Sequence, residues 1–163
     1  MKRLLIAATA LIGILTVQDA LAATAGSTIS VSASVGTACG VSATPLLFRT
    51  VAPGANTTTG TATVTVTCTS GGAYDVGLDY GANSNPGTQR NLLGTNLGGL
   101  VTYGLFQDSA ALTTPWGPVI GTNTLHETGN GSAQAWTVYG KIPGSQGPAG
   151  DAYTDTVNVT VTY

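Results

Sequence analysis

The sequence predicts an all-β protein built as an antiparallel β-sandwich, and three observations support this. Apolar side chains alternate with polar ones in several short runs, the period of a half-buried strand. Thr, Val, Gly, Ser and Asn dominate, whereas Lys, Arg and Glu, which normally cover solvent-facing helices, are scarce. No helical period follows the first 22 residues, so short strands joined by turns are the expected architecture.

The N-terminus has the features of a secretory signal peptide. Lys2 and Arg3 precede an apolar stretch over residues 4–17, and Ala20, Leu21 and Ala22 form a small-x-small cleavage site. We expect a signal peptide over residues 1–22, with cleavage after Ala22 or Ala23. The apolar stretch is shorter than the roughly 20 residues that span a bilayer, and no later segment approaches that length. The sequence therefore predicts an exported chain with no membrane span after signal removal.

The remaining 141 residues (163 minus 22) suit a single domain. They carry three basic and six acidic residues, and 3 minus 6 gives a formal charge of −3. Nucleic acid is not an expected partner, because binding to a phosphate backbone depends on clustered Lys and Arg. An anionic membrane surface is disfavoured for the same reason.

We expect about seven strands, each bounded by Gly, Pro, Asn or Ser. Their predicted ranges are 29–35, 46–48, 60–69, 74–80, 100–107, 133–142 and 155–163. Residues 81–99 are rich in Gly and Asn, which favours a surface excursion with room for a short hairpin rather than a buried element. Trp116 lies in a turn rich in Pro and Gly and is expected to be exposed.

The final run is predicted to be one uninterrupted strand that ends at Tyr163. One face of it carries Val157, Val159, Val161 and Tyr163. With no strand after it, its edge would be open to pairing with another chain. The candidate for that pairing is the N-terminal run of a neighbouring copy, with Ile29, Val31, Ala33 and Val35 on one face. The alternative is that both runs are ordinary strands of a complete, self-contained sandwich.

Two cysteines, Cys39 and Cys68, occur in this exported chain, and a disulfide between them is the expected state. Closing a loop of about 30 residues contributes roughly 3 to 4 kcal/mol in the chain-entropy model. Cys68 lies in the alternating run that includes Val64 and Val66, so it should point into the core. A metal site would need more ligands than the single histidine, His126, can add. No metal or cofactor is expected.

Catalytic chemistry is hard to place in this sequence, and we expect no enzyme. His126 and Glu127 are predicted to lie in a solvated loop, and Asp75 and Asp79 share a predicted strand face without any sign of the burial that acid catalysis needs. The aromatic residues could form a sugar-binding platform, but core positions are the commoner use of such side chains. Three glycosylation sequons, at Asn56, Asn130 and Asn158, are expected by chance in a chain this rich in Thr.

Three stretches carry a family resemblance. They are the alternating N-terminal run leading into Val-Gly-Thr-Ala-Cys at residues 35–39, the Thr/Val strand that contains Cys68, and the closing Gly-Asp-Ala-Tyr-Thr-Asp-Thr-Val-Asn-Val-Thr-Val-Thr-Tyr at residues 150–163. Together they resemble the spore coat protein U domain family, which includes subunits of archaic, Csu-type chaperone-usher pili. Ala152 is one residue more than the commoner Gly-x-Tyr spacing of these proteins.

The resemblance implies an incomplete immunoglobulin-like sandwich that is completed by a donor strand. Residues 23–36 would be the donor segment and residues 37–163 the sandwich domain, with Ile29, Val31, Ala33 and Val35 as donor side chains. Val157, Val159, Val161 and Tyr163 would line one wall of the acceptor groove, and the Cys39–Cys68 disulfide would staple the domain.

The implied function is that of a structural subunit of a surface fibre used for adhesion and biofilm formation. Its implied partners are copies of itself or sibling pilins, a periplasmic chaperone and an outer-membrane usher. Its implied location, after export through the periplasm, is a fimbrium on the cell surface. The alternative is a spore or cell-surface coat protein that folds as a self-contained unit.

Overall fold

The computed structural model describes residues 24–51, 56–84, 88–109 and 111–163. The chain divides into two units, residues 1–34 and 35–163. In the first unit, residues 24–34 form no strand and all their side chains are exposed. The predicted signal peptide over residues 1–22 lies outside the described residues.

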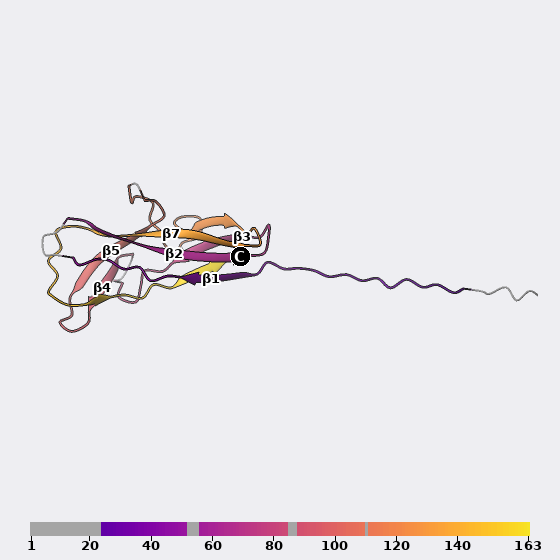
Figure 1. The fold of residues 1–163 in the computed structure, drawn as a ribbon, viewed down its shortest axis with the longest axis horizontal. Helices are drawn as coiled ribbons and strands as arrows, with labels where there is room; N and C mark the ends of the chain where they lie inside the picture. The colour runs from indigo at the N-terminus through magenta and orange to yellow at the C-terminus, as the bar shows by residue number, and fades with distance from the viewer. Residues whose placement is uncertain (1–23, 52–55, 85–87, 110) are drawn as a thin grey trace, which may run out of the picture. The chain divides into compact units, whose positions relative to one another are not determined.

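The second unit consists of strands and loops, and the described residues contain no helix. The strands are β1 (Cys39–Ala43), β2 (Thr58–Cys68), β3 (Ala73–Leu78), β4 (Arg90–Gly94), β5 (Leu100–Phe106), β6 (Leu125–Thr128), β7 (Ala133–Ile142), β8 (Tyr153–Thr154) and β9 (Val159–Thr162). Figure 1 shows the long β2 and β7 side by side along the body of the domain. The prediction of an all-β fold is confirmed, with nine described strands instead of about seven.

The strands form two antiparallel sheets. The larger sheet has the order β1-β2-β7-β5-β4-β8, and the smaller has the order β6-β3-β9. The chain passes from the first sheet to the second at residues 69–72, where Gly71 has a φ of 82° that only glycine adopts without strain. This change of sheet places β2 and β3 face to face, as in an immunoglobulin-like sandwich.

The core lies between the sheets and is built by inward-facing residues of alternating strands. Val64, Val66 and Cys68 of β2 meet Tyr74, Val76 and Leu78 of β3, and all six are at most 2% exposed. The buried residues of β5, of β7 and of the long loop before β6 complete the core: Val101, Tyr103, Leu105, Val138, Ile142 and Trp116. The prediction that Cys68 points into the core is confirmed.

A pair of glycines makes a recess in the inner face of the larger sheet. Gly60 of β2 and Gly140 of β7 are direct cross-strand partners. A Cβ at Gly140 would lie 2.8 Å from the Phe48 ring and 2.9 Å from the Leu46 side chain, both of which occupy the recess. The backbone of Leu47 would lie 2.6 Å from a Cβ at Gly60. The two glycines therefore allow the segment after β1 to cross close over the sheet.

The structure corrects several predicted strand positions. The N-terminal run 29–35 and residues 46–48 are not strands. Of the predicted strand 155–163, only Val159–Thr162 (β9) is a strand, and it pairs with β3 in the smaller sheet. β8 pairs with β4 in the larger sheet, so a break at the change of sheets precedes β9. His126 and Glu127 lie in β6 and not in a loop. Alternating sequence alone cannot show where a chain changes sheets, which is why the break was missed.

Residues 81–99 contain β4, which forms a hairpin with β5 and buries Arg90 and Asn91. The Arg90 guanidinium donates to the carbonyl oxygens of Asp79, Leu78 and Trp116 at 2.8 to 2.9 Å, and it lies 5.4 Å from the centroid of the Tyr80 ring. Burial lowers the pKa of Arg90, but guanidinium groups stay charged in proteins. This side chain links β3, β4 and the loop before β6.

Trp116 is 1% exposed, so its predicted exposure is wrong. Its indole Nε1 donates to the Val76 carbonyl oxygen at 2.8 Å, and its backbone N–H donates to Leu105. These bonds fold the Pro/Gly-rich loop back over the end of the sandwich. The turn residues around Trp116 indicate where the chain reverses but not which way the side chain points.

We expect Arg90→Ala to destabilise the domain by about 2 to 4 kcal/mol, because it leaves three carbonyl oxygens without their charged donor in a buried site. Thermal and denaturant unfolding of the full chain, followed by far-ultraviolet circular dichroism, measures the change. Arg49→Ala, which removes an exposed positive charge, is the matched control and should change stability by less than about 0.5 kcal/mol. Equal losses in both variants would contradict the structural role given to Arg90.

Candidate functional site

An apolar cleft of about 870 Å³ runs along the domain between two stretches of chain. One wall is formed by residues 43–51, which run from the last residue of β1 into the segment after it. The other is formed by residues 148–151, 153–157 and 159, which include β8 and the start of β9. Core side chains of β2, β3, β4, β5 and β7 form the floor: Ala62, Val64, Leu78, Leu92, Val101, Tyr103, Leu105, Val138 and Ile142. The cleft therefore lies directly over the hydrophobic core.

Both walls come from edges of the sheets. β1 and β8 are the two outermost strands of the larger sheet, and β9 is an outermost strand of the smaller one. β1 and β9 approach to within 8 Å between Cα atoms, without being paired with each other. Neighbouring strands in a sheet lie about 4.7 to 4.9 Å apart. An edge of the larger sheet and an edge of the smaller one therefore lie close together beside the cleft.

The second wall has an unpaired main-chain edge. The carbonyl oxygens of Asn158 and Thr156 accept hydrogen bonds from Asp79 N and Ala82 N on the β3 side. Because backbone groups alternate in direction along a strand, the N–H and C=O of the odd-numbered residues Val157 and Val159 point away from β3. The same valines contribute side chains to the cleft. An added strand would find both main-chain partners and apolar contacts along this wall.

On the opposite wall, Leu46 and Phe48 lean over the floor. The Phe48 ring packs edge-on against the Tyr103 ring with 5.9 Å between centroids. Both side chains are half-buried, as are Leu92 and Tyr153 near the other end of the cleft. Leu47, by contrast, is 77% exposed at the rim. The floor residues are nearly inaccessible because these rim side chains cover them.

Two carboxylates hold the second wall where the chain changes sheets. Asp155 accepts a hydrogen bond from the Tyr103 hydroxyl at 2.7 Å, and its other oxygen accepts from the backbone N–H groups of Asn83 and Thr156. Burial and then this bond raise the pKa of Tyr103, so its hydroxyl stays protonated as the donor. A Cβ at Gly81 would collide with the Asp155 carboxylate, so only glycine fits there.

Asp79 is the second of these carboxylates. It accepts hydrogen bonds from Asn158 N at 3.0 Å, from Asn158 Nδ2 at 2.6 Å and from Gly81 N at 2.9 Å. Burial pushes its pKa up, but the bonds from Asn158 and Gly81 outweigh burial and lower the pKa overall. Asp79 and Asn158 thus fasten the segment between β8 and β9 to the end of β3.

Asp151 orders the turn at one end of the cleft. Its carboxylate accepts from the backbone N–H groups of Leu97 and Asn96 at 2.7 and 2.8 Å and from Asn96 Nδ2 at 2.7 Å. The bond from Leu97 N is the main cause that lowers the pKa of Asp151 well below its usual range. The β4–β5 turn and the chain leading into β8 are thereby joined.

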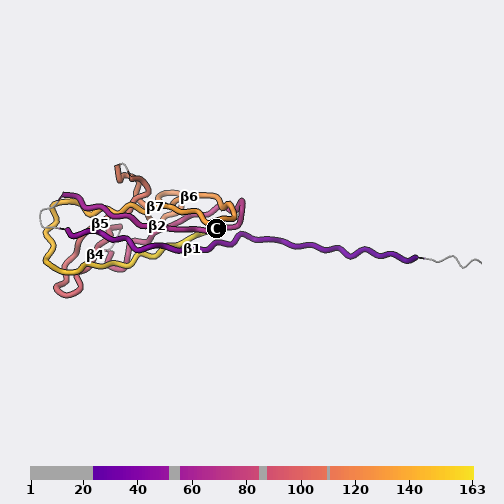
Figure 2. The backbone as a smooth tube through the Cα atoms, viewed as in Figure 1, coloured from indigo at the N-terminus to yellow at the C-terminus, as the bar shows by residue number. Residues whose placement is uncertain are grey.

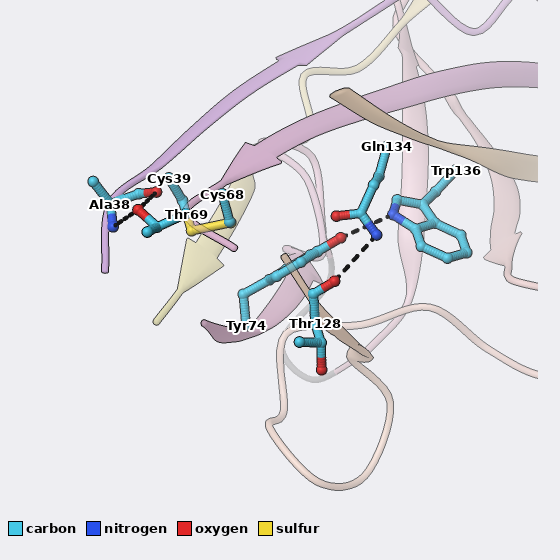
Figure 3. Close-up of a disulfide and its surroundings, with 8 residues drawn as sticks. All are labelled: Ala38, Cys39, Cys68, Thr69, Tyr74, Thr128, Gln134 and Trp136. Atoms are coloured by element: carbon cyan, nitrogen blue, oxygen red, sulfur yellow. Dashed lines mark hydrogen bonds between the residues drawn. A yellow bond between two sulfur atoms is a disulfide. The ribbon is translucent and has the colours of Figure 1, made fainter. Parts of the chain in front are cut away.

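The other end of the domain is closed by the disulfide between Cys39 and Cys68, whose Cα atoms lie 4.1 Å apart (Figure 3). It joins β1 to β2 at a directly paired position. The same close-up shows Ala38 hydrogen-bonded to Thr69 beside it. The start of β1 is therefore fixed covalently and by main-chain pairing.

The structure places the predicted acceptor residues in two groups. Val157 and Val159 line the cleft, whereas Val161 packs against the core outside its lining and Tyr163 is 61% exposed. The predicted donor residues Ile29, Val31 and Val35 are 86 to 88% exposed, and Ala33 is also exposed. Figure 2 follows the chain from this segment into β1.

The wall of residues 43–51 was not anticipated as part of the site. The sequence predicts only a short strand over residues 46–48. The Gly60–Gly140 recess that seats Leu46 and Phe48 depends on a pairing between strands far apart in sequence. Asp79 and Asp155 were likewise missed, because their bonds to Asn158 and Tyr103 span 79 and 52 residues. In the sequence, Asp79 stands near the end of one predicted strand and Asp155 at the start of another, which does not indicate that they act on the same wall.

The other chemical candidates lie away from the cleft lining. His126 Nδ1 is 3.2 Å from Asp75 Oδ2, and Thr124 donates to the second oxygen of Asp75. The described residues hold no group of three or more His, Cys, Asp or Glu side chains placed to bind a metal ion. In the same part of the chain, no helix has the length and apolar character needed to cross a membrane.

The Spore Coat Protein U domain family model matches residues 25–160. This match covers most of the chain, including both walls of the cleft, the disulfide and the exposed run 29–35. The chain belongs to this family. A comparison with curated protein sequences finds no match.

Comparison with solved structures finds matches that include two chaperone complexes. One is the CsuC–CsuE chaperone–tip adhesion subunit pre-assembly complex from archaic chaperone-usher Csu pili of Acinetobacter baumannii, with a TM-score of 0.59 and 22% identity over 79% of this chain. The aligned region is 40% of that chain. The other is a chaperone–tip adhesin complex of CFA/I fimbriae, at 16% identity over 75% of this chain and 41% of that one. The TM-score of this second match is 0.38.

We expect Asp79→Asn to weaken the hydrogen bonds that hold the second wall at Asn158 and to destabilise the domain by about 1 to 2 kcal/mol. This is the low end of the range for hydrogen bonds to a charged group, because the carboxylate is only partly buried. The pKa of Asp79 is lowered in the folded state, so its contribution is present above the ordinary carboxyl pKa and is lost as pH falls through the folded value. The stability difference from the unaltered protein should therefore shrink below about pH 4. Chemical denaturation across a pH series measures it.

Asp108→Asn is the control for this prediction. Asp108 also accepts several backbone hydrogen bonds, from Thr113, Thr114 and Ala111, and its pKa is also lowered, first by the bond from Thr114. It does not line the cleft. Hydrogen exchange should show faster opening of residues 155–159 in the Asp79 variant alone. Equal opening in both variants would contradict a specific role for Asp79 in the wall.

Proposed function

We propose that this protein is a non-enzymatic structural subunit of a surface fibre, polymerised by strand donation. The cleft of one subunit takes up residues 23–36 of another, with Ile29, Val31, Ala33 and Val35 directed to the core. One observation carries the proposal: an apolar cleft between two free sheet edges occurs in the same chain as an exposed run with strand alternation. Such an arrangement suits a strand as the occupant.

The chemistry of the cleft favours a strand over a small molecule. The wall at Val157 and Val159 has a free main-chain edge, so an extended peptide gains main-chain hydrogen bonds there as well as side-chain burial. Ile29, Val31 and Val35, now almost fully exposed, would each contribute roughly 1.5 to 3 kcal/mol when buried, and Ala33 less. The donor and the cleft are different surfaces of the subunit, so the contact is heterologous and extends into an open filament.

The acceptor wall in this proposal is centred on Val157 and Val159, with Val161 and Tyr163 continuing the same edge beyond the cleft lining. Residues 43–51 form the facing wall. The Cys39–Cys68 disulfide holds the start of that wall in place while the cleft is empty.

Membership of the Spore Coat Protein U domain family and the fold likeness to a Csu chaperone–subunit complex support the partners that we propose. These are a periplasmic chaperone that shields the cleft before assembly, an outer-membrane usher, and further copies or sibling pilins. We further propose export through the periplasm to a fimbrium on the cell surface, with a role in adhesion and biofilm formation.

We expect Val31→Asp to abolish polymer formation, because donation would bury an unpaired carboxylate at a cost of several kcal/mol, a more than hundredfold weakening of the joint. Multimers that survive unheated denaturing electrophoresis, together with fibres seen by electron microscopy, provide the readout. The matched control is Ser32→Asp, which adds the same charge on the opposite face of the run and should leave the multimers intact.

A stable monomer from the unaltered chain, unaffected by Val31→Asp, would contradict donation and favour the alternative of a self-contained coat protein. Loss of multimers in both variants would mean that charge alone, rather than the face that carries it, controls assembly. Either result would remove the donor role of the 29–35 run.

A further inference from the structure

The N-terminal segment leaves the domain through two anchored residues, Thr37 and Ala38. Ala38 N donates to Thr69 Oγ1 at 3.1 Å, and the Ala38 carbonyl oxygen accepts from Thr69 N at 3.0 Å (Figure 3). The Thr37 methyl group packs against Gly72, where a Cβ would come within 2.5 Å of it. With the neighbouring disulfide, these contacts extend the pairing of β1 with its partner back past Cys39. Gly36 is the residue before this fixed stretch.

We propose that this anchoring sets the register of the N-terminal segment so that it cannot fill its own cleft, which leaves a second copy of the chain as the donor. The inference rests on the proposed function, since it concerns which molecule supplies the strand. The anchoring of Thr37 and Ala38 would explain why the product is a polymer and not a closed monomer.

The register follows from residue numbers. To fold back beside β1, the segment must form a hairpin, and the tightest turn that spares Thr37 and Ala38 uses Val35 and Gly36. Ser34 then lies opposite Thr37, so the two residue numbers of every pair in this hairpin sum to 71. Residue 43, where the cleft begins, opposes residue 28, and residue 47 opposes residue 24. The cleft would receive residues 24–28, whose sequence is Thr-Ala-Gly-Ser-Thr, small and polar.

The apolar run 29–35 would in this register lie beside the first part of β1, before the cleft starts. For the run to be centred on the cleft, residue 32 must lie opposite residue 47, and the residue numbers of each pair then sum to 79. Residue 36 would then oppose residue 43, and residues 37–42 would become the loop. Forming that loop would break the Ala38–Thr69 hydrogen bonds and most of the pairing of β1 with β2. The hairpin would therefore disrupt β1, the strand with which the segment has to pair.

The reverse direction is excluded by length. Residue 36 would have to lie near residue 51 while residue 37 stays at the disulfide end. The eight residue steps from 43 to 51 alone span up to about 26 Å at 3.3 Å per residue, whereas consecutive Cα atoms are about 3.8 Å apart. A second copy has no such connection to satisfy, so its apolar run can take either direction and the best register.

An insertion can relieve the register restraint and provides the test. Eight Gly and Ser residues placed between Gly36 and Thr37 change the sum of paired positions from 71 to 79 while β1 stays intact. We expect this variant of the full chain to become a monomer with its own 29–35 run in the cleft. Multimers should be lost, and hydrogen exchange should show protection of residues 29–35 that does not depend on protein concentration.

The matched control carries the same eight residues between Gly26 and Ser27. This lengthens the segment equally but leaves the register of the apolar run unchanged, so the control should polymerise as the unaltered chain does. Size-exclusion chromatography with light scattering distinguishes the two products.

A second measurement uses the unaltered full chain and does not depend on whether the insertion folds. Protection of residues 29–35 should appear only in multimers and should rise with protein concentration. Protection that is independent of concentration in a monomer would overturn the register restraint but keep the cleft as a strand acceptor. Absence of protection in the unaltered multimer and in both insertion variants would instead overturn the proposed function itself.

Discussion

An open sheet edge beside an apolar core is costly in water, and the described domain has such an edge on each side of one cleft. Its main-chain groups lack strand partners, and the apolar side chains beneath are covered only by rim residues such as Leu46 and Phe48. The rest of the structure can be understood from this constraint. The two walls are not hydrogen-bonded to each other as neighbouring strands, so each is held in place by contacts with the rest of the domain.

The fastening differs between the walls. The wall of residues 43–51 starts at the disulfide and is seated in the recess made by Gly60 and Gly140, so it depends on covalent linkage and packing. The other wall depends on polar contacts, with Asp79 and Asp155 holding the chain where it passes from β8 to β9. Arg90 lies behind Asp79 and bonds to its carbonyl oxygen. Three of the few charged residues of this chain, Asp79, Arg90 and Asp155, therefore stabilise the second wall.

Much of the fold could be predicted from local sequence. Alternation located β2, β3, β5 and β7, and cysteine count and compartment predicted the Cys39–Cys68 disulfide, which is present. The errors share a physical cause, because each depends on contacts between distant residues. Arg90 is buried by carbonyl groups up to 26 residues away, and Trp116 is turned inward by Val76, 40 residues away. The wall of residues 43–51 was missed because its position depends on the distant pair Gly60 and Gly140, and its own sequence shows no alternating pattern.

The same sequence pattern in the 29–35 run could serve a closed monomer or an open fibre, because a strand contributes similar burial and hydrogen bonding in either case. Connectivity decides between them. In this chain only Gly36 separates the apolar run from residues held by Thr69 and Gly72, and that is too short a connection to bring the run over the cleft of its own domain. Lengthening it would remove the restraint without altering a single cleft contact. The state of assembly would then follow from the number of residues between two fixed points, and the apolar side chains would decide only how strongly the joint holds.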